Sequence, residues 1–507
     1  MAVLMEVTEP SRALRIVPRG AGRLLRIELR RNAMLWLLPL AAVLFWWQAY
    51  RSVLAMPPLW SLRAMSLQND ALLDFAVPVT AAAAWMGGRE RRRHIAEMLT
   101  STARVRWARN LAAWAATTCW ALAGYIVCVG VVYVITARQA VGGGPLWWPV
   151  IVGAFGIPAV AAVGFTAGAL APSRFTTPLV AIAAFFALGF SFSSAPDGHS
   201  PLLLSPLIAD APQVGADQGI ATFYHYLPDL SIAQIMFLAG LTIALLGVLG
   251  VVPGSAGPRL RGFAAIVTAV GVAAAGTAVG LADTARMDPH GMLVIPALHD
   301  AASDQPVRYT PVCSHAAIPV CMNPLYAAYL PAVTAALEPV ISQVAGLPGA
   351  PAEISQAAEV YTGNGYNGVA ALRTGPVFGM RLPGLPGVAG MTSTAFTAQL
   401  QQSAAFRIAA QVAGFSPADP SASQAQLAVA AALAGPSTWG GTLSLQAGPG
   451  GAGPGNLQQP AGPVQPGSPV GAAARGFAAL PAAARHAWLV QHLAALRAGN
   501  VALAQVP

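Results

Sequence analysis

Long apolar runs, separated by clusters of charged residues, organise the first 281 residues of the chain. A helix that crosses a bilayer needs about 20 mostly apolar residues. Seven runs reach or approach that length: 32–50, 71–88, 110–136, 146–171, 178–192, 231–252 and 262–281. Run 178–192 is the shortest and needs neighbouring residues to complete a span. The pattern predicts an all-α polytopic membrane protein with about seven transmembrane helices.

Beyond residue 281 the apolar positions become sparser, and Pro and Gly interrupt them often. Helices are expected at 330–344, with a break at Pro339, at 391–414 and at 421–433. Residues 448–469 form a Gly/Pro linker, and residues 470–507 are expected to form two short helices that dock back through Phe477 and Trp488. We see no strong strand alternation. Residues 282–447 are therefore predicted to form a mostly helical domain outside the bilayer.

The composition agrees with lipid as the main solvent. Only 9% of the residues are charged and 55% are hydrophobic, whereas soluble chains carry about 25% charged residues. All 28 basic residues are arginines. A P-loop requires a lysine, so this chain is not expected to bind ATP through a Walker A motif or to carry any cofactor of its own.

The arginines also predict an orientation, because cytoplasmic loops retain positive charge. With the N-terminus inside, the cytoplasmic pieces hold 17 arginines, whereas the short outer loops hold three. Residues 1–31 would then be a cytoplasmic amphipathic segment. An odd number of helices leaves the C-terminal domain outside the cell, which predicts a multi-pass plasma-membrane protein. Topology accounts for the net charge of +9, so no nucleic-acid partner is expected.

The segment between the second and third runs is the most informative. It reads GGRERRRHIAEMLTSTARVRW over residues 87–107. In a helix, Ile95, Met98 and Leu99 share one face and the arginines occupy the rest. The pattern fits an amphipathic helix beneath the membrane that offers charges to a cytosolic partner. A plain positively charged anchor loop fits it equally well.

This loop, together with the segment GRLLRIELRRNAMLWLLPL before the first run, resembles the permease subunit of type-2 ABC transporters. The likeness covers residues 20–255 and implies that the chain pairs with a copy of itself or a second permease, and with a separate ATPase subunit that binds ATP and Mg²⁺. It also implies that Glu90, Arg91, Glu97 and Thr100 lie near the ATPase contact. The seventh helix and the large outer domain depart from the simple six-helix members.

Two cysteines of the tail, which we define as the residues beyond 281, are Cys313 and Cys321. They lie close enough in sequence to form a small disulfide loop outside the cell. A zinc site that adds His315 is the rival reading, but a structural zinc site needs four ligands and no fourth is nearby. The disulfide is favoured and no metal is expected.

Asp74 is the only ionisable residue placed inside a predicted span. An intramembrane carboxylate is a functional candidate by default. Because Asp74 follows Asp70 near the predicted outer interface, a helix-cap or interfacial role is favoured over a substrate site.

Three functional classes remain open on these patterns. The favoured one is the permease subunit of an ATP-driven transporter. The alternative is a membrane-anchored sensor or interaction protein whose outer domain binds a ligand or partner. A membrane-embedded enzyme is the third class, and it is disfavoured because the sequence holds no HExxH or GxSxG motif and no paired carboxylates in the spans.

Overall fold

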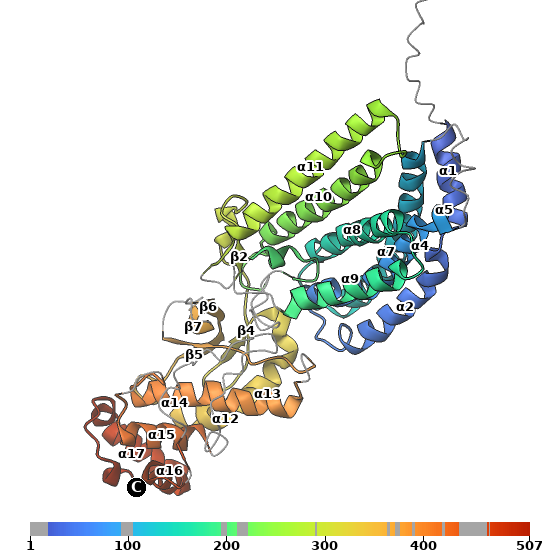
Figure 1. The fold of residues 1–507 in the computed structure, drawn as a ribbon. Coiled ribbons are helices and arrows are strands. Elements are labelled where there is room, and N and C mark those ends of the chain that lie inside the picture. The colour runs from blue at the N-terminus through green and yellow to red at the C-terminus, as the bar shows by residue number, and fades with distance from the viewer. Residues whose placement is uncertain are drawn as a thin grey trace, which may run out of the picture.

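The structure is a computed structural model. It describes residues 19–92, 105–193, 200–209, 222–288, 292–361, 366–370, 376–387, 391–417, 421–435, 464–465 and 467–507. Across these residues the chain is mostly helical. It forms an elongated helix bundle with a second, more mixed domain at one end (Figure 1).

The bundle is built from helices that run back and forth along its long axis. They are α1 (Arg19–Arg30), α2 (Met34–Arg51), α3 (Trp60–Ser66), the π-helical turn η1 (Leu67–Ala71), α4 (Leu72–Gly87), α5 (Arg89–Arg92), α7 (Arg106–Gln139), α8 (Trp148–Leu170), α9 (Thr176–Ser193), the 3₁₀ turn η2 (Pro201–Leu204), α10 (Asp229–Val251) and α11 (Pro258–Asp283). We call the end that holds α1 and α5 the basic end, and the opposite end, which meets the C-terminal domain, the domain end (Figure 1).

Within the described residues, five helical segments are long and apolar enough to cross a membrane: α7, α8, α10, α11 and Pro324–Val344. A sixth span results if the pair Gly22–Arg30 and Met34–Arg51, bent by 59°, is counted as one. The helices α4, with 16 residues, and α9, with 18, are shorter. Each of the seven predicted runs falls on a helix, and several of these helices are able to span a bilayer.

Small residues bring the bundle helices into close contact. A Cβ added to Gly164 of α8 would lie 2.4 Å from the carbonyl oxygen of Thr80 in α4, and one added to Gly168 would lie 2.1 Å from that of Ala84. Helices α10 and α11 also approach closely, since a Cβ added to Gly240 of α10 would lie 2.6 Å from the backbone nitrogen of Ala275 in α11. Lipid tails are as apolar as leucine, so helices in lipid associate through such tight packing rather than through hydrophobic burial.

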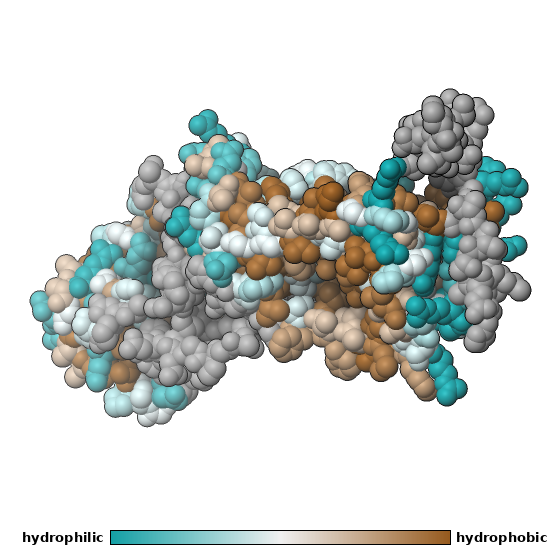
Figure 2. All heavy atoms as spheres, turned by 45° about the horizontal axis from the view of Figure 1, so that its top comes forward, coloured by the Kyte–Doolittle hydropathy of each residue, from teal (hydrophilic) through white to brown (hydrophobic). Residues whose placement is uncertain are grey.

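The outward faces of these helices are apolar. Exposed side chains include Trp36 and Val43 of α2, Phe186 of α9 and Ile266 of α11. Figure 2 shows hydrophobic side chains gathered over the middle of the bundle and hydrophilic ones at its basic end. An apolar band between polar ends is the surface that a bilayer covers.

The C-terminal domain combines helices with short strands. The helices are α12 (Leu330–Val344), α13 (Ser393–Leu400), α14 (Phe406–Ala413), α15 (Gln424–Ala434), α16 (Pro469–Ala479) and α17 (Ala482–Arg497). A four-stranded sheet has the order β3 (Val312–Cys313), β4 (Val320–Met322), β5 (Glu353–Gln356) and β8 (Val377–Met380), and two antiparallel pairs join β1 (Arg286–Met287) to β2 (Leu293–Val294) and β6 (Ala358–Tyr361) to β7 (Tyr366–Ala370).

Among its described residues the domain has more residues in helices than in strands, as expected, but the sequence analysis did not predict the sheet. Its strands are two to four residues long, too short for an alternating pattern to stand out. The pairs β4–β5 and β5–β8 are parallel, and strands of parallel pairs are commonly buried on both faces. All three residues of β4 are buried, so that strand reads as a plain apolar run.

Pro339 does not break helix α12, which corrects the expected break. The residue lies on the exposed side of the helix, as does Ala335 four residues earlier, so the carbonyl freed by the missing N–H is open to water. The buried face of α12, which includes Val333, Leu337 and Ile341, packs into the domain core. The apolar character of Pro324–Val344 is therefore satisfied inside this domain.

The two domains share a core, although the sequence suggested a division at residue 281. Leu59, at the start of α3, and Leu62, within α3, are buried in the hydrophobic core of the C-terminal domain. Nearby, the backbone N–H of Val307 donates to the carbonyl of Phe223 at 2.7 Å, and the Asn323 amide donates to the carbonyl of Thr222 at 3.3 Å. The C-terminal domain is thus seated directly on the domain end of the bundle.

Candidate functional site: a charged helix junction at the basic end

The junction is located by the close packing of α4 against α8. A Cβ added to Gly87 would lie 2.3 Å from the carbonyl oxygen of Phe165, and Gly88 lies against Gly168 and the Arg92 side chain. At Gly87 the near atoms belong to the backbone of α8, so only glycine fits there. The chain therefore leaves α4 at a fixed point and turns at once into α5, which begins the segment predicted to contact the ATPase.

Glu90, in the first turn of α5, points inward to α7. Its Oε1 lies 3.0 Å from Nε of Arg109, and its Oε2 lies 3.8 Å from Nε of Arg106. The Glu90 side chain is only 15% exposed. A half-buried carboxylate held by two guanidinium groups fixes the direction of α5 relative to the start of α7.

Helix α1 joins the same junction. Glu28 is 8% exposed and its Oε1 lies 2.8 Å from Nη2 of Arg89. After α1, the Asn32 amide donates to Thr117 Oγ1 at 3.0 Å, and Trp120 Nε1 donates to the carbonyl of Leu29 at 2.9 Å. These contacts tie α1 to both α5 and α7.

Arg91 differs from its neighbour because its side chain is exposed. The exposed Arg174, in the α8–α9 connection, lies at the same end of the bundle. The basic end thus presents positive charge to its surroundings, while both of its described acids, Glu28 and Glu90, are engaged by arginines.

Of the four residues expected at the ATPase contact, Glu90 and Arg91 are described, and Glu97 and Thr100 lie outside the described residues. The sequence reasoning missed Glu28, Arg106 and Arg109 as partners. Glu28 is the one acid in the arginine-rich segment 19–31, and that isolation was a usable signal. Nothing local in the sequence pointed to Arg106 or Arg109.

Asp74 does not belong to this junction. It lies in the first turn of α4, at the domain end, four residues after Asp70. Asp70 accepts a hydrogen bond from Ser52 Oγ at 2.7 Å, and Oδ2 of Asp74 is buried without a hydrogen-bond partner. Within the described parts of the chain, no three His, Cys, Asp or Glu side chains are grouped to hold a metal.

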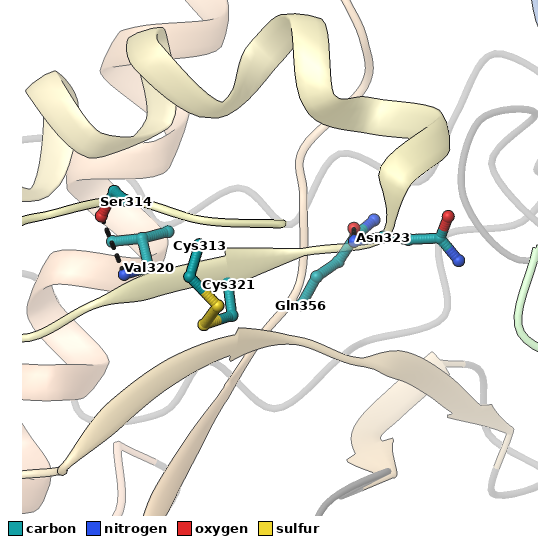
Figure 3. The surroundings of a disulfide bond; sticks show 6 residues. All are labelled: Cys313, Ser314, Val320, Cys321, Asn323 and Gln356. Carbon is teal, nitrogen blue, oxygen red and sulfur yellow. Dashed lines mark hydrogen bonds between the residues drawn. A yellow bond between two sulfur atoms is a disulfide. The ribbon is translucent and has the colours of Figure 1, made fainter. Parts of the chain in front are cut away.

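Cys313 and Cys321 form a disulfide in the C-terminal domain. The bond joins the paired residues of β3 and β4 (Figure 3), and the N–H of Val320 donates to Ser314 Oγ at 3.0 Å beside it. Both sulfurs are bonded to each other, so the zinc alternative with His315 has no thiolates to use. At the end of β4, the Asn323 N–H donates to Gln356 Oε1 at 3.0 Å and links the strand to β5.

Comparison with protein-family models, with curated proteins and with solved structures finds no match for this chain.

Proposed function

We propose that the chain is the transmembrane permease subunit of an ATP-driven ABC transporter, and that a separate ATPase docks on the segment that begins with α5 at the basic end. In this proposal seven helices span the plasma membrane, the basic end faces the cytoplasm and the C-terminal domain lies outside the cell. The observation that carries the proposal is the junction around Glu90. It anchors the start of the segment 87–107 to three bundle helices.

The charge distribution supports this orientation. Arginines gather at the basic end, whereas the domain end of the bundle carries Arg51, Arg63 and Arg138. Cytoplasmic loops retain Arg and Lys, and a disulfide such as Cys313–Cys321 persists in an oxidising compartment. Both features favour the same assignment of inside and outside.

The contacts of the junction suggest how an ATPase would act on the bundle. A force applied to α5 passes through Glu90 to Arg106 and Arg109 of α7, and through Arg89 to Glu28 of α1. The glycine contacts of Gly87 transmit it to α8. Tightly packed elements move as units and respond to small displacements at one end. ATP and Mg²⁺ would bind to the ATPase partner, and a second permease chain would complete the transporter.

The experiment is affinity purification of the full chain from gently solubilised membranes, with partners identified by mass spectrometry. Because Arg91 is exposed and Glu90 is engaged inside the chain, Arg91→Glu tests docking with little effect on the fold. Arg174→Glu is the matched control, since it reverses an exposed charge at the same end.

We expect a P-loop ATPase to co-purify in stoichiometric amount, to be lost with Arg91→Glu and to be kept with Arg174→Glu. Recovery of the wild-type chain without an ATPase, while a control transporter keeps its own, would refute the proposal. In that case the sensor or anchor class is favoured, and deletion of the C-terminal domain rather than change at Arg91 should abolish partner binding.

A further inference from the structure

A surface groove runs along α2 toward the domain end. It is lined by Ala42, Val43, Trp46, Trp47, Tyr50 and Arg51. Val43, Trp47 and Tyr50 are 64%, 61% and 74% exposed, so large apolar and amphipathic side chains line an open surface.

Arg51 closes this groove at the end of the helix. Its guanidinium carbon lies 4.0 Å from the centroid of the Trp47 ring, a cation–π contact that holds the charge over the groove. Within the described residues Arg51 makes no ion pair. Asp70, on η1 beside α2, is engaged by Ser52. The groove therefore ends in a positioned cation that no acid of the described chain neutralises.

The length of the groove suits one leaflet of a bilayer. Arg51 follows Ala42 by nine positions, which is about 13.5 Å along a helix at ~1.5 Å per residue. Half of a hydrocarbon core is about 15 Å thick. When Arg51 lies at headgroup level, Ala42 and Val43 lie near the middle of the membrane, and Trp46, Trp47 and Tyr50 occupy the interface where such rings prefer to sit.

We propose that this groove is a binding site for an anionic phospholipid, with the lipid phosphate on Arg51 and an acyl chain along Ala42, Val43 and Trp46. The unpaired guanidinium provides the charge complementarity, because Arg recognises phosphate with two parallel N–H groups. A zwitterionic lipid fits less well, since its ammonium group competes for the phosphate. The site does not depend on the proposed permease function.

The test uses the full chain, purified in detergent and incubated with phosphatidylglycerol that carries a photoactivatable group on its acyl chain. Labelled peptides are mapped by mass spectrometry. The variants are Arg51→Gln, Arg51→Lys, which keeps the charge, and Arg138→Gln, the matched control at an exposed arginine in the last turn of α7. Each variant is first checked for a monodisperse elution profile.

We expect labelling of the α2 peptide to fall about fivefold with Arg51→Gln, the ratio expected for one arginine near an anionic surface. Arg51→Lys should retain most of the labelling and Arg138→Gln all of it. Excess unlabelled phosphatidylglycerol should compete better than phosphatidylcholine. Equal labelling in Arg51→Gln and wild type would overturn the proposal, as would equal competition by unlabelled phosphatidylcholine and phosphatidylglycerol.

Discussion

The contact between α4 and α8 leads to a sharp prediction about Gly164. Replacing it with alanine places a Cβ 2.4 Å from the carbonyl oxygen of Thr80 and 3.1 Å from the Thr80 carbonyl carbon and Cα. All three are backbone atoms of a helix and have no rotamer through which to move away. Ordinary carbon–oxygen contacts lie at about 3.3 Å or more, so the helices must separate by roughly 0.9 Å.

Such a separation affects the whole seam. A gap of ~0.5–1 Å forfeits a quarter to a half of the dispersion energy of each contact, and Gly168 and Gly87 on the same seam lie as close to backbone oxygens. Overpacking of this kind costs about 1–3 kcal/mol. Replacing a helical glycine with alanine also stabilises the helix by up to ~1 kcal/mol through helix propensity. This gain opposes the overpacking, so the control must be another helical glycine that receives the same gain.

Gly130→Ala is that control. Gly130 lies within α7, is exposed, and has no atom within 4 Å of an added Cβ. Heating purified variants in detergent, followed by size-exclusion chromatography, gives the temperature at which half of the monodisperse protein is lost. We expect this temperature to be several °C lower for Gly164→Ala than for Gly130→Ala. Equal temperatures, or a higher one for Gly164→Ala, would refute the packing argument.

Two further predictions concern the domain end. Replacing both Cys313 and Cys321 with Ser opens the loop between residues eight apart and should lower the free energy of unfolding of the C-terminal domain by roughly 2.5 kcal/mol. Urea titration measures this change, with Cys119→Ser as the control. An unchanged unfolding transition would contradict the prediction. Arg63→Gln removes a guanidinium that is 3% exposed and donates to Thr136 Oγ1 and the Met56 carbonyl. The substitution should lower the free energy of unfolding by about 2–3 kcal/mol and speed amide hydrogen exchange over residues 52–59. Arg138→Gln should have neither effect. Equal exchange in the two variants would show that Arg63 does not hold this connection.

The membrane half was more predictable than the tail for a physical reason. A helix in lipid must satisfy every backbone group internally, so each span leaves a long apolar run that is visible in the sequence. The tail contains the parallel pairs β4–β5 and β5–β8, whose partners lie 24 or more residues apart in the sequence, such as Val320 and Ile354. No local pattern encodes that pairing.

The junction shows the same division at the level of single residues. Glu90 and Arg91 are adjacent, and the sequence assigned both to one surface. In the structure Glu90 turns inward because Arg106 and Arg109 arrive beside it on α7, and Arg91 is left exposed. Burial depends on which helix packs alongside, and periodicity within α5 alone does not contain that information.

The sequence by itself determined that the first half of the chain suits a lipid environment, where its helical runs lie and how its charges are distributed. These properties depend on composition and local spacing. It also placed two cysteines close enough to bond. Only the tertiary structure decided which acids are engaged, that Leu59 and Leu62 enter the core of the C-terminal domain, and that Pro339 is tolerated within α12. Each of these depends on contacts between segments distant in the chain, where packing and the pairing of buried charges outweigh local preference.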